Sequence, residues 1–312
     1  MLKKYRILIF GSGVIGSIFG GRLAVAGHDV TMLARGNRLK ELNESGLLLK
    51  KSNQKIVDKI PVNIISQLSA TDNYDFVFVV IRKEQISQAL SVLQKNNSQN
   101  FVFMVNNPGG YSDWTNALGE SRVIPAFPGA GGKIENSIVC YHIFSKFIQL
   151  TTLGEINGFL STRIKVLKEI ISKAGFPVSI SKNMDAWQKT HVAIIAPLGN
   201  VIYYDGGDNY TVSKNKSAIV QMNQTLKENF TFLKESGIDI EPSRLNLIRW
   251  LPLWFLNLIM KSAFNTKWTE TVIYSHAQNA RIEMKTITRE FLDMANDRGF
   301  VLKELEKMFE YI

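Results

Sequence analysis

The spacing of apolar and polar residues divides the chain into two stretches of different character. In the first stretch, short apolar runs rich in β-branched residues alternate with segments of helical periodicity. The runs predict buried strands, and the periodic segments predict helices between them. Strands are expected at residues 7–10, 29–33, 74–81, 101–105 and 177–180, with further strands within 46–62 and 123–153, and helices at 14–26, 38–44, 85–93 and 161–174. This alternation predicts a doubly wound parallel sheet of the Rossmann type.

From residue 185 onward, the apolar pattern is helical throughout. Helices are expected at residues 187–195, 214–236, 245–264, 275–298 and 302–311. A chain of 312 residues also exceeds the usual size of a single hydrophobic core. We therefore predict two domains: an α/β domain at residues 1–182, followed by an all-α domain at residues 183–312.

The turn between the first strand and the first helix carries the pattern G-x-G-x-x-G. Gly11 permits a tight turn, Gly13 lets the backbone approach a pyrophosphate, and Gly16 allows the helix to pack closely on the strand. The first amides of the helix favour an anion at the same point. We interpret this turn as a dinucleotide site, because a strand precedes it and a helix follows it. The predicted cofactor-binding residues here are Gly11, Ser12, Gly13, Val14, Ile15 and Gly16.

The end of the second strand indicates which dinucleotide is bound. Proteins that bind NAD usually place an acidic residue there to hold the ribose 2′-hydroxyl. This chain instead has Arg35 and Arg38, whose guanidinium groups suit a 2′-phosphate. The sequence therefore predicts NADPH as the cofactor. In the alternative interpretation, the two arginines only lie at the start of a solvated helix.

Charge and cysteine content narrow the classes of partner. The formal net charge is +10, but the lysines are scattered and do not cluster with aromatic residues. We therefore expect a basic surface that attracts the cofactor and an anionic substrate, and no nucleic-acid partner. The single cysteine, Cys140, excludes an internal disulfide framework, fits a reducing cytoplasm and is interpreted as a structural thiol. No cluster of His, Asp or Glu has metal-ligand spacing, so no metal is predicted.

The most membrane-like segment lies at residues 250–260, between Arg249 and Lys261. It is too short to span a bilayer. We expect a helix that is buried between domains or between the subunits of a homodimer, and no membrane partner. Attachment to the membrane interface is the alternative. The N-terminus is not interpreted as a signal peptide, because Gly11 and Gly13 interrupt its apolar stretch.

The sequence resembles the ketopantoate reductase family across nearly its whole length. The resemblance rests on the segments GHDVTMLARGNRLKEL, FVFVVIRKEQ, VNNPGG, TTLGEINGF and AWQKT, and on the spacing between Glu283 and Gly299. It implies hydride transfer from NADPH to the ketone of a small-molecule 2-oxo acid, in a cleft between the sheet domain and the helical domain. The substrate that the family resemblance implies is 2-dehydropantoate, reduced to pantoate in the biosynthesis of pantothenate and coenzyme A.

The resemblance also implies roles for individual residues. Lys189 corresponds to the general acid, which stabilises and protonates the alkoxide formed by hydride attack. Asn107 corresponds to a residue that orients the nicotinamide and this lysine, and Glu283 to an acceptor of hydrogen bonds from substrate hydroxyls. Without the resemblance, these three residues would be interpreted as an exposed helix lysine, a turn asparagine and a solvated carboxylate. His191 and His276 are further candidates for lining the pocket.

Several positions differ from the family's pattern. Arg82, predicted to bind the cofactor, stands where a lysine is typical, with Lys83 beside it. Ala193 replaces an asparagine that contacts a substrate hydroxyl. Lost hydrogen-bonding groups change specificity more readily than chemistry. One alternative is therefore a paralogue that reduces a different, more apolar 2-oxo acid, and another is an NADPH-binding regulator without turnover. The remaining departures are Pro108 for glycine, Thr271 for serine and Lys285 for an acidic residue.

Overall fold

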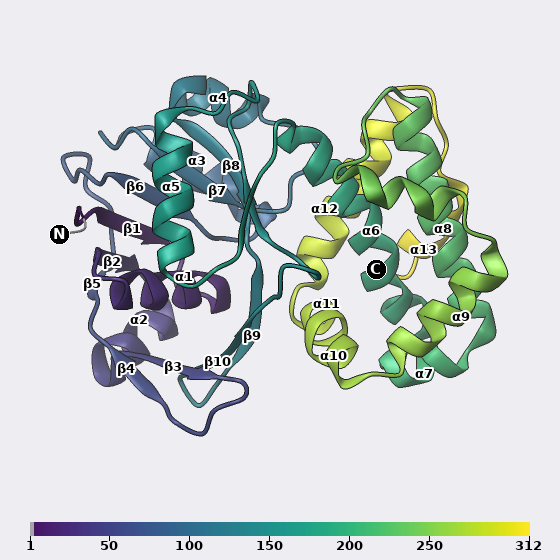
Figure 1. Ribbon diagram of the computed structural model, residues 1–312, viewed down its shortest axis with the longest axis horizontal. Helices are drawn as coiled ribbons and strands as arrows, with labels where there is room; N and C mark the ends of the chain where they lie inside the picture. Colours follow the sequence, from purple (N-terminus) through teal and green to yellow (C-terminus); the bar gives the residue numbers. More distant parts are fainter. Residues whose placement is uncertain (1–2) are drawn as a thin grey trace. The chain divides into compact units, whose positions relative to one another are not determined.

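The structure is a computed structural model that describes residues 3–312, except the side chain of His276. This part of the chain divides into two compact units, coloured along the sequence in Figure 1. Among the described residues, the sheet unit comprises residues 3–105 and Tyr111–Met184, and the helical unit comprises Asn106–Gly110 and Asp185–Ile312. The division after Met184 lies close to the boundary expected at residue 182, but the short segment Asn106–Gly110 joins the helical unit although sheet-unit residues flank it.

The main sheet contains eight strands within residues 3–312, in the order β12-β11-β8-β7-β6-β1-β2-β5. Their bounds are β1 Arg6–Phe10, β2 Asp29–Leu33, β5 Asn63–Ile65, β6 Phe76–Val79, β7 Phe101–Met104, β8 Val123–Phe127, β11 Thr151–Leu153 and β12 Val178–Ile180. Paired strands are parallel except β11 and β8, which are antiparallel. Because β1 lies inside the sheet with parallel neighbours on both sides, the predicted doubly wound α/β class is confirmed.

Helices cover both faces of this sheet. α1 (Val14–Val25) and α5 (Thr162–Lys173) share one core with every second residue of β7, namely Val102 and Met104. Phe103 points to the other face, where its ring stacks on Trp114 of α4 (Ser112–Leu118). Successive strand residues therefore pack against different helices, as expected for a strand buried on both faces. The other helices of this unit are α2 (Gly36–Ser45), η1 (Lys83–Gln85), α3 (Ile86–Leu93) and η2 (Glu120–Arg122).

A second sheet packs against α1. Among the described residues its strand order is β4-β3-β10-β9, with bounds β3 Leu47–Lys51, β4 Asp58–Ile60, β9 Ala130–Glu135 and β10 Ile138–Ile143. Gly21 of α1 allows this approach, because a Cβ at that position would lie 2.4 Å from Leu49 Cδ1 of β3. The expected strands within 46–62 and 123–153 are therefore present, but most of them form this separate sheet, and only β8 and β11 extend the main one.

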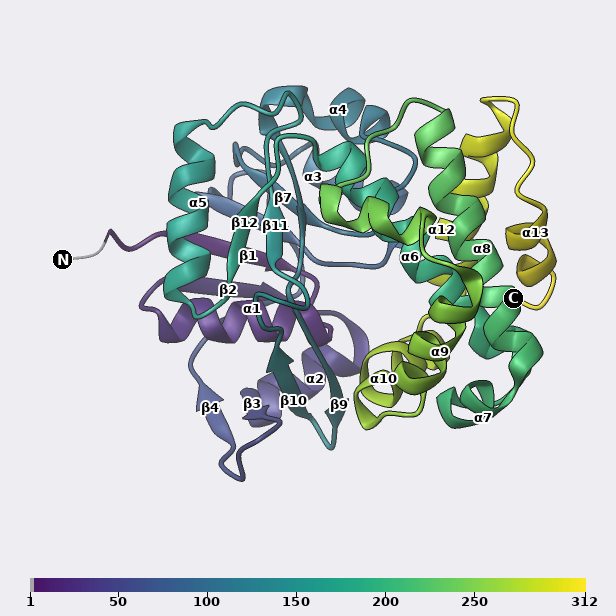
Figure 2. The same cartoon turned by 45° about the vertical axis from the view of Figure 1, so that its right-hand side comes forward.

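The described residues of the helical unit form no strand, which confirms the predicted all-α second part (Figure 2). Its longest helix is α6 (Met184–Asp205), which continues through Pro197 and beyond the expected end at residue 195. The other helices are α7 (Asn209–Lys214), α8 (Lys216–Glu235), η3 (Ser243–Arg249), α9 (Leu253–Phe264), α10 (Lys267–Thr269), η4 (Glu270–Tyr274), α11 (Ser275–Asn279), α12 (Arg281–Asn296) and α13 (Lys303–Phe309).

Two of the helices expected from the sequence are interrupted. The helix expected at 245–264 is divided into η3 and α9 at Pro252, which has no backbone N–H to continue the ladder of the preceding turn. The helix expected at 275–298 is divided at Ala280, whose φ of −129° is not helical. Among the described helices, none is both long enough and apolar enough to cross a membrane.

The core of the helical unit fixes α6 and α12 relative to each other. Ala196 of α6, Phe230 of α8 and Phe291 of α12 belong to one buried cluster. Phe232 of α8 meets Phe291 edge-on, with ring centroids 5.6 Å apart. Edge-to-face aromatic contacts of this kind add to the free energy of burial. α6 and α12 carry Lys189 and Glu283, so this packing holds the two residues in a common framework.

Candidate active site

The glycine turn after β1 has the geometry that its sequence predicts. Gly11 has φ +117°, and a Cβ there would lie 2.3 Å from the carbonyl oxygen of Val80. A Cβ on Gly16 would lie 1.9 Å from the carbonyl oxygen of Gly11, so only glycine lets α1 pack this closely on the turn. At Gly13, by contrast, an added Cβ would meet no atom within 4 Å beyond its own chain neighbours and its own helix. The turn is therefore closed on the protein side and open at Gly13.

The open side coincides with the N-terminus of α1. Gly13 is the N-cap residue of this helix and offers no side-chain acceptor to the first backbone amides. Helix N-termini carry partial positive charge and bind phosphate groups through such amides. The local structure therefore fits the pyrophosphate of a dinucleotide, with the predicted residues Ser12, Val14 and Ile15 completing the turn.

The two arginines after β2 differ in their surroundings. Arg38 Nε donates to the Ser12 carbonyl oxygen at 3.1 Å, and its Nη2 donates to Ser17 Oγ at 3.2 Å. Its Nη1 forms an ion pair with Glu41 at 2.9 Å. Arg38 thus ties the start of α2 to the glycine turn. Arg35 is the N-cap residue of α2 and is exposed, so its side chain is the more accessible of the two to a 2′-phosphate.

Arg82 and Lys83 lie after β6, at the carboxyl end of the main sheet. Arg82 is exposed, and its backbone N–H donates to Gln85 Oε1 at 3.2 Å at the start of η1. The Lys83 ammonium lies 6.0 Å from the centroid of the Trp114 ring, within the range of a cation–π contact. Ligands of open α/β sheets bind at this end of the strands, so both side chains lie at the expected edge.

The segment Asn106–Gly110 forms a loop immediately after β7. Asn107 is fully buried, and its Nδ2 donates to the Gly110 carbonyl oxygen at 2.5 Å. Asn106 Nδ2 donates to Glu283 Oε1 at 2.9 Å, which joins the loop to the first turn of α12. Glu283 is buried, with 7% of its surface exposed. A Cβ on Gly109 would lie 3.4 Å from Glu290 Oε2, two turns farther along the same helix.

Lys189 is buried on α6 and has an acidic neighbour. Only 7% of its surface is exposed, which contradicts the interpretation as an ordinary exposed lysine. Its Nζ forms an ion pair with Asp185, one helical turn earlier. The other carboxylate oxygen of Asp185 faces the loop, because a Cβ on Gly110 would lie 3.8 Å from Asp185 Oδ1. The loop, the Lys189 turn of α6 and the Glu283 turn of α12 therefore meet within the helical unit.

The positions that depart from the family's pattern lie in different environments. Ala193 is fully buried in the apolar cluster of α6, α8 and α12, and its carbonyl oxygen accepts from Asn229 Nδ2 at 3.1 Å. Lys285 is exposed, and its Nζ donates to the carbonyl oxygen of Ile312 at 3.2 Å. Thr271 lies in η4, and its Oγ1 donates to the Lys267 carbonyl oxygen.

Of the two histidine candidates, His191 stacks on Trp187, with ring centroids 5.3 Å apart. The side chain of His276 lies outside the described residues. Cys140 lies in β10 and is partly exposed. No group of three or more His, Cys, Asp or Glu among the described residues is arranged to hold a metal ion.

Sequence reasoning missed Asn106, Asp185 and Glu290 as members of this cluster. Asp185 had a local signal, since a carboxylate four residues before a lysine shares its helix face. Asn106 and Glu290 had none, because their neighbours in the structure are distant in sequence.

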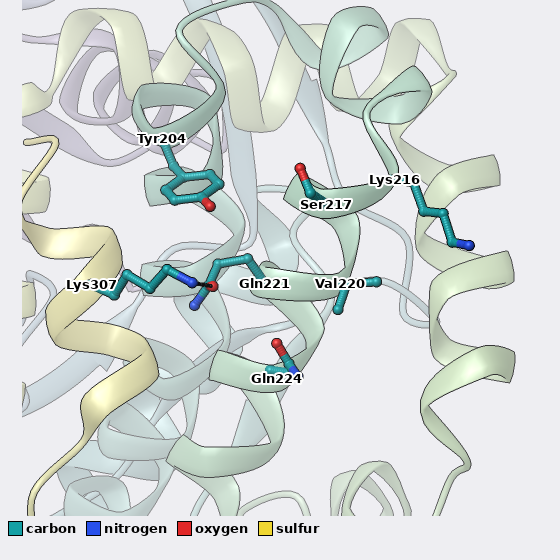
Figure 3. A pocket seen from close by; sticks show the side chains of 7 residues that line it. All are labelled: Tyr204, Lys216, Ser217, Val220, Gln221, Gln224 and Lys307. Carbon is teal, nitrogen blue, oxygen red and sulfur yellow. Dashed lines mark hydrogen bonds between the residues drawn. The ribbon is translucent and has the colours of Figure 1, made fainter.

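A surface hollow of about 460 Å³ lies on the helical unit away from these residues (Figure 3). It is lined by Tyr204, Lys216, Ser217, Val220, Gln221, Gln224 and Lys307. Two of its polar side chains are already hydrogen-bonded: Lys307 Nζ donates to Gln221 Oε1 at 2.6 Å, and Gln221 Nε2 donates to Glu304 Oε2, outside the lining, at 2.7 Å. None of the predicted site residues lines this hollow.

Comparison with known proteins identifies relatives. Residues 7–158 match the family model described as ketopantoate reductase PanE/ApbA. A 2-dehydropantoate 2-reductase of Pyrococcus horikoshii is 24% identical over 247 residues, which cover 78% of this chain and 78% of that protein. The uncharacterized oxidoreductase YkpB of Bacillus subtilis is 24% identical over 255 residues, 76% of this chain and 78% of that protein.

Solved structures extend the likeness to the whole fold. The 2-dehydropantoate 2-reductase of Geobacter metallireducens has a TM-score of 0.78 and 15% identity, over 98% of both chains. D-mandelate dehydrogenase in ternary complex with NADH and anilino(oxo)acetate has a TM-score of 0.76 and 15% identity, over 98% of this chain and 96% of that one. The resemblance predicted from the sequence is confirmed: the chain is related to the ketopantoate reductase family, by sequence over residues 7–158 and by fold over nearly its whole length.

Proposed function

We propose that this protein is an NADPH-dependent oxidoreductase that reduces the ketone of a 2-oxo acid to the 2-hydroxy acid. The observation that carries the proposal is the meeting of the Asn106–Gly110 loop with Lys189 and Glu283 in one compact unit. An ammonium group, carboxylates and side-chain amides are thereby brought together. These groups supply what carbonyl reduction asks of a protein: a proton donor, and partners that orient the substrate.

Lys189 is the proposed general acid. The nicotinamide, when bound, supplies the hydride, and the protein's task is to stabilise and protonate the oxygen on which negative charge develops. A buried ammonium group suits this task, because charge interactions are stronger away from water. Asp185 holds the Lys189 Nζ at the first turn of α6 and so limits its orientations.

The glycine turn and the arginine that follows β2 are the proposed cofactor site. The unblocked N-terminus of α1 suits the pyrophosphate, and the exposed Arg35 suits a 2′-phosphate. Arg38 contributes by holding the turn in place, since two of its nitrogens bond to Ser12 and Ser17. Arg82, at the carboxyl edge of the sheet, is proposed to contribute a further positive charge.

Glu283 and Asn106 are proposed to bind a substrate hydroxyl. Asn106 Oδ1 is buried and accepts no hydrogen bond from the described residues. Buried acceptors are almost always satisfied, so a hydroxyl donor of the substrate would complete this one. 2-Dehydropantoate carries such a hydroxyl as well as its 2-oxo acid group. It is therefore the first candidate substrate, and the proposed reaction is its reduction to pantoate for pantothenate synthesis.

A second candidate substrate class is supported by Ala193. An alanine packed among apolar residues offers no hydrogen bond to a substrate. A fold relative is named for D-mandelate, an aryl-substituted 2-hydroxy acid. A more apolar 2-oxo acid is therefore the alternative to 2-dehydropantoate.

The test is NADPH oxidation by the purified protein with a panel of 2-oxo acids, including 2-dehydropantoate and phenylglyoxylate, with NADH in parallel. Lys189→Ala is expected to lower kcat by about 100-fold or more, the usual contribution of a positioned acid. Lys173→Ala is the matched control, because Lys173 also pairs with a carboxylate four residues away, but on the exposed surface of α5. Its kcat is expected to stay unchanged.

Each outcome of this assay has a definite reading. Turnover that is lost only in Lys189→Ala supports the proposal, and the best acid of the panel decides between the two substrate classes. Unchanged turnover in Lys189→Ala would refute the proposed acid. Tight NADPH binding without turnover of any acid would instead favour a regulator that binds the cofactor.

A further inference from the structure

An exposed apolar face runs from η3 along the first half of α9. Trp250 is 74% exposed, Trp254 is 69% exposed and Leu258 is 61% exposed. We call this surface the tryptophan face. It consists of Leu247, Trp250, Trp254, Phe255, Leu258 and Ile259. Large apolar side chains that gather on one surface generally mark a site of interaction.

α9 is apolar on the side facing the protein as well. Leu256 and Phe264 are buried, and Met260 packs against both apolar clusters of the helical unit. Trp254 and Leu258 lie at other positions of the same helix and are exposed. A helix that is hydrophobic all round is normally buried all round. The outward half of α9 is therefore an apolar surface that residues 3–312 leave largely uncovered.

The charged residues of the segment that carries this face have one sign. Residues 242–269 contain four basic residues and no Asp or Glu. The four are Arg244, Arg249, Lys261 and Lys267. The Arg249 guanidinium lies 5.7 Å from the Trp250 ring, at the edge of the tryptophan face. A partner for this surface must tolerate or attract positive charge.

The helices that pack against α9 do not offset this charge. α7 ends in Lys214, and the carboxylate of its N-cap residue, Asp208, accepts the backbone N–H of Thr211 at 2.8 Å. In α8, Glu228 is turned to the start of α13, where it accepts the backbone N–H groups of Glu304 and Leu305 at 3.0 and 3.1 Å. That carboxylate is therefore already satisfied. The second acidic residue of α8, Glu235, is its last residue.

A second copy of the chain is a poor occupant. In a symmetric dimer each surface meets its own copy, so the basic flanks of the tryptophan face would oppose identical basic flanks. Like charges brought together across an interface disfavour association. An anionic lipid surface has the opposite charge. Basic residues beside exposed tryptophan and leucine are the composition of helices that lie in the membrane interface.

We propose that the tryptophan face binds the surface of a membrane that contains anionic lipids, with α9 lying in the plane of the interface. The aromatic and leucine side chains enter the boundary between headgroups and acyl chains, and the four basic residues contact phosphate groups. This binding is peripheral, and it departs from the expectation of no membrane partner. It does not depend on the proposed enzymatic function, because the face contains none of the proposed site residues.

The test is co-sedimentation of the full-length protein with vesicles of phosphatidylcholine alone or mixed with phosphatidylglycerol. Binding to the mixed vesicles is expected to be at least about tenfold tighter and to weaken as salt rises, because salt screens the attraction. Two variants separate the contributions. W250S/W254S/L258S removes the apolar part, and R244Q/K261Q/K267Q removes charge without touching the apolar residues. Both are expected to reduce binding about tenfold or more.

The matched control is F147S/F159S, which alters two exposed phenylalanines of the sheet unit and is expected to bind as the unaltered protein does. Thermal unfolding verifies that each variant is folded. Absence of binding to either kind of vesicle overturns the proposal. So does a dimer, detected by sedimentation velocity, that W250S/W254S/L258S converts to monomers, since the face would then be a contact between copies.

Discussion

The hydrogen bond between Asn106 and Glu283 joins two residues that are 177 positions apart in the sequence. Asn106→Ala is expected to lower kcat/KM by about 10- to 100-fold, because a hydrogen bond to a charged group contributes roughly 1.5–3 kcal/mol and each 1.4 kcal/mol is tenfold. The loss should fall mainly on KM if Glu283 binds the substrate hydroxyl.

Asn223→Ala is the matched control for this prediction. Asn223 Nδ2 also donates a bond of 2.9 Å, to Asn257 Oδ1, but in another part of the helical unit. The test is to measure kcat and KM of both variants by steady-state kinetics. An equal loss of kcat/KM in both would show a general loss of stability, and would contradict a positioning role for Asn106.

The same residues show how far sequence alone reaches. The partner of Lys189 could be predicted from the sequence, since Asp185 lies one turn earlier on the same helix face. The partner of Glu283 could not be predicted, because nothing in the pattern near residue 283 specifies a contact with a loop near residue 106. The burial of Lys189 could not be predicted from the sequence either. The resemblance implied a role for this residue, but only the packing shows that 7% of its surface is exposed. The roles of Lys189, Asn107 and Glu283 in catalysis stay predictions.

Glu155 provides a test of stability against pH. It pairs with Arg163, whose Nε donates at 2.7 Å. Burial alone would raise the pKa of Glu155, but hydrogen bonds from Arg163 and Ser161 outweigh it and hold the pKa below the ordinary 4.5. A carboxyl group with a lowered pKa in the folded state stabilises the protein above its unfolded pKa, and this contribution is lost as the pH falls through the folded pKa.

Glu155→Gln is therefore expected to reduce the free energy of unfolding by about 2 kcal/mol at pH 7, the typical value of a hydrogen bond to a charged group. The difference between variant and unaltered protein should shrink as the pH falls below 4.5. Urea unfolding at a series of pH values measures this difference. A difference that is the same at pH 7 and in acid would contradict the assignment.

Helix α8 depends on Asn215 at its N-terminus. Asn215 Oδ1 accepts the backbone N–H groups of Ser217 at 3.1 Å and Ala218 at 3.3 Å. Asn215→Ala is expected to lower the free energy of unfolding by about 1 kcal/mol, because these amides lose their acceptor. Asn215→Ser keeps a capping oxygen and loses only the separate bond to Asp205. Thermal unfolding of the two variants gives the comparison, and equal losses would refute the capping role.

The elements were predicted well where one local rule determines them. Strand β1 is buried on both faces, as shown by Ile7, Leu8 and Ile9. A continuous apolar run predicts such a strand. Periodicity alone did not place the break at Pro252, although proline restricts the backbone in a known way. Nor did it place the break at Ala280, where the residue type gives no warning. The apolar pattern also did not predict which strands pair. Nothing in the sequence of β9 or β10 specifies that they join β3 in a separate sheet and not the main sheet.

At the scale of the whole molecule, each unit has its own hydrophobic core. The cluster around Ile7, Phe19 and Phe78 lies in the sheet unit, and the clusters around Phe230 and Met222 lie in the helical unit. Units with separate cores unfold as separate cooperative steps unless a large interface couples them. Differential scanning calorimetry is therefore expected to resolve two transitions.

NADPH is expected to move the transition of the sheet unit, which contains the proposed cofactor site. Ligand at about 100 times its dissociation constant stabilises the unit that binds it by about 2.7 kcal/mol. NADH at the same concentration should shift it less, because Arg35 has no 2′-phosphate to bind. A single transition that both cofactors raise equally would contradict this expectation.

The membership of Asn106–Gly110 in the helical unit has a consequence for recombination between relatives. A crossover after Met184 would exchange α6 and α12 as one contiguous piece, and with them Lys189 and Glu283. The loop that bonds to Glu283 would stay behind with the other parent. Chimeras built at that junction therefore need residues 106–110 from the parent of the C-terminal piece. Two separate segments of the gene therefore encode this site. A library that exchanges only the C-terminal segment would separate Glu283 from the loop residue that bonds to it.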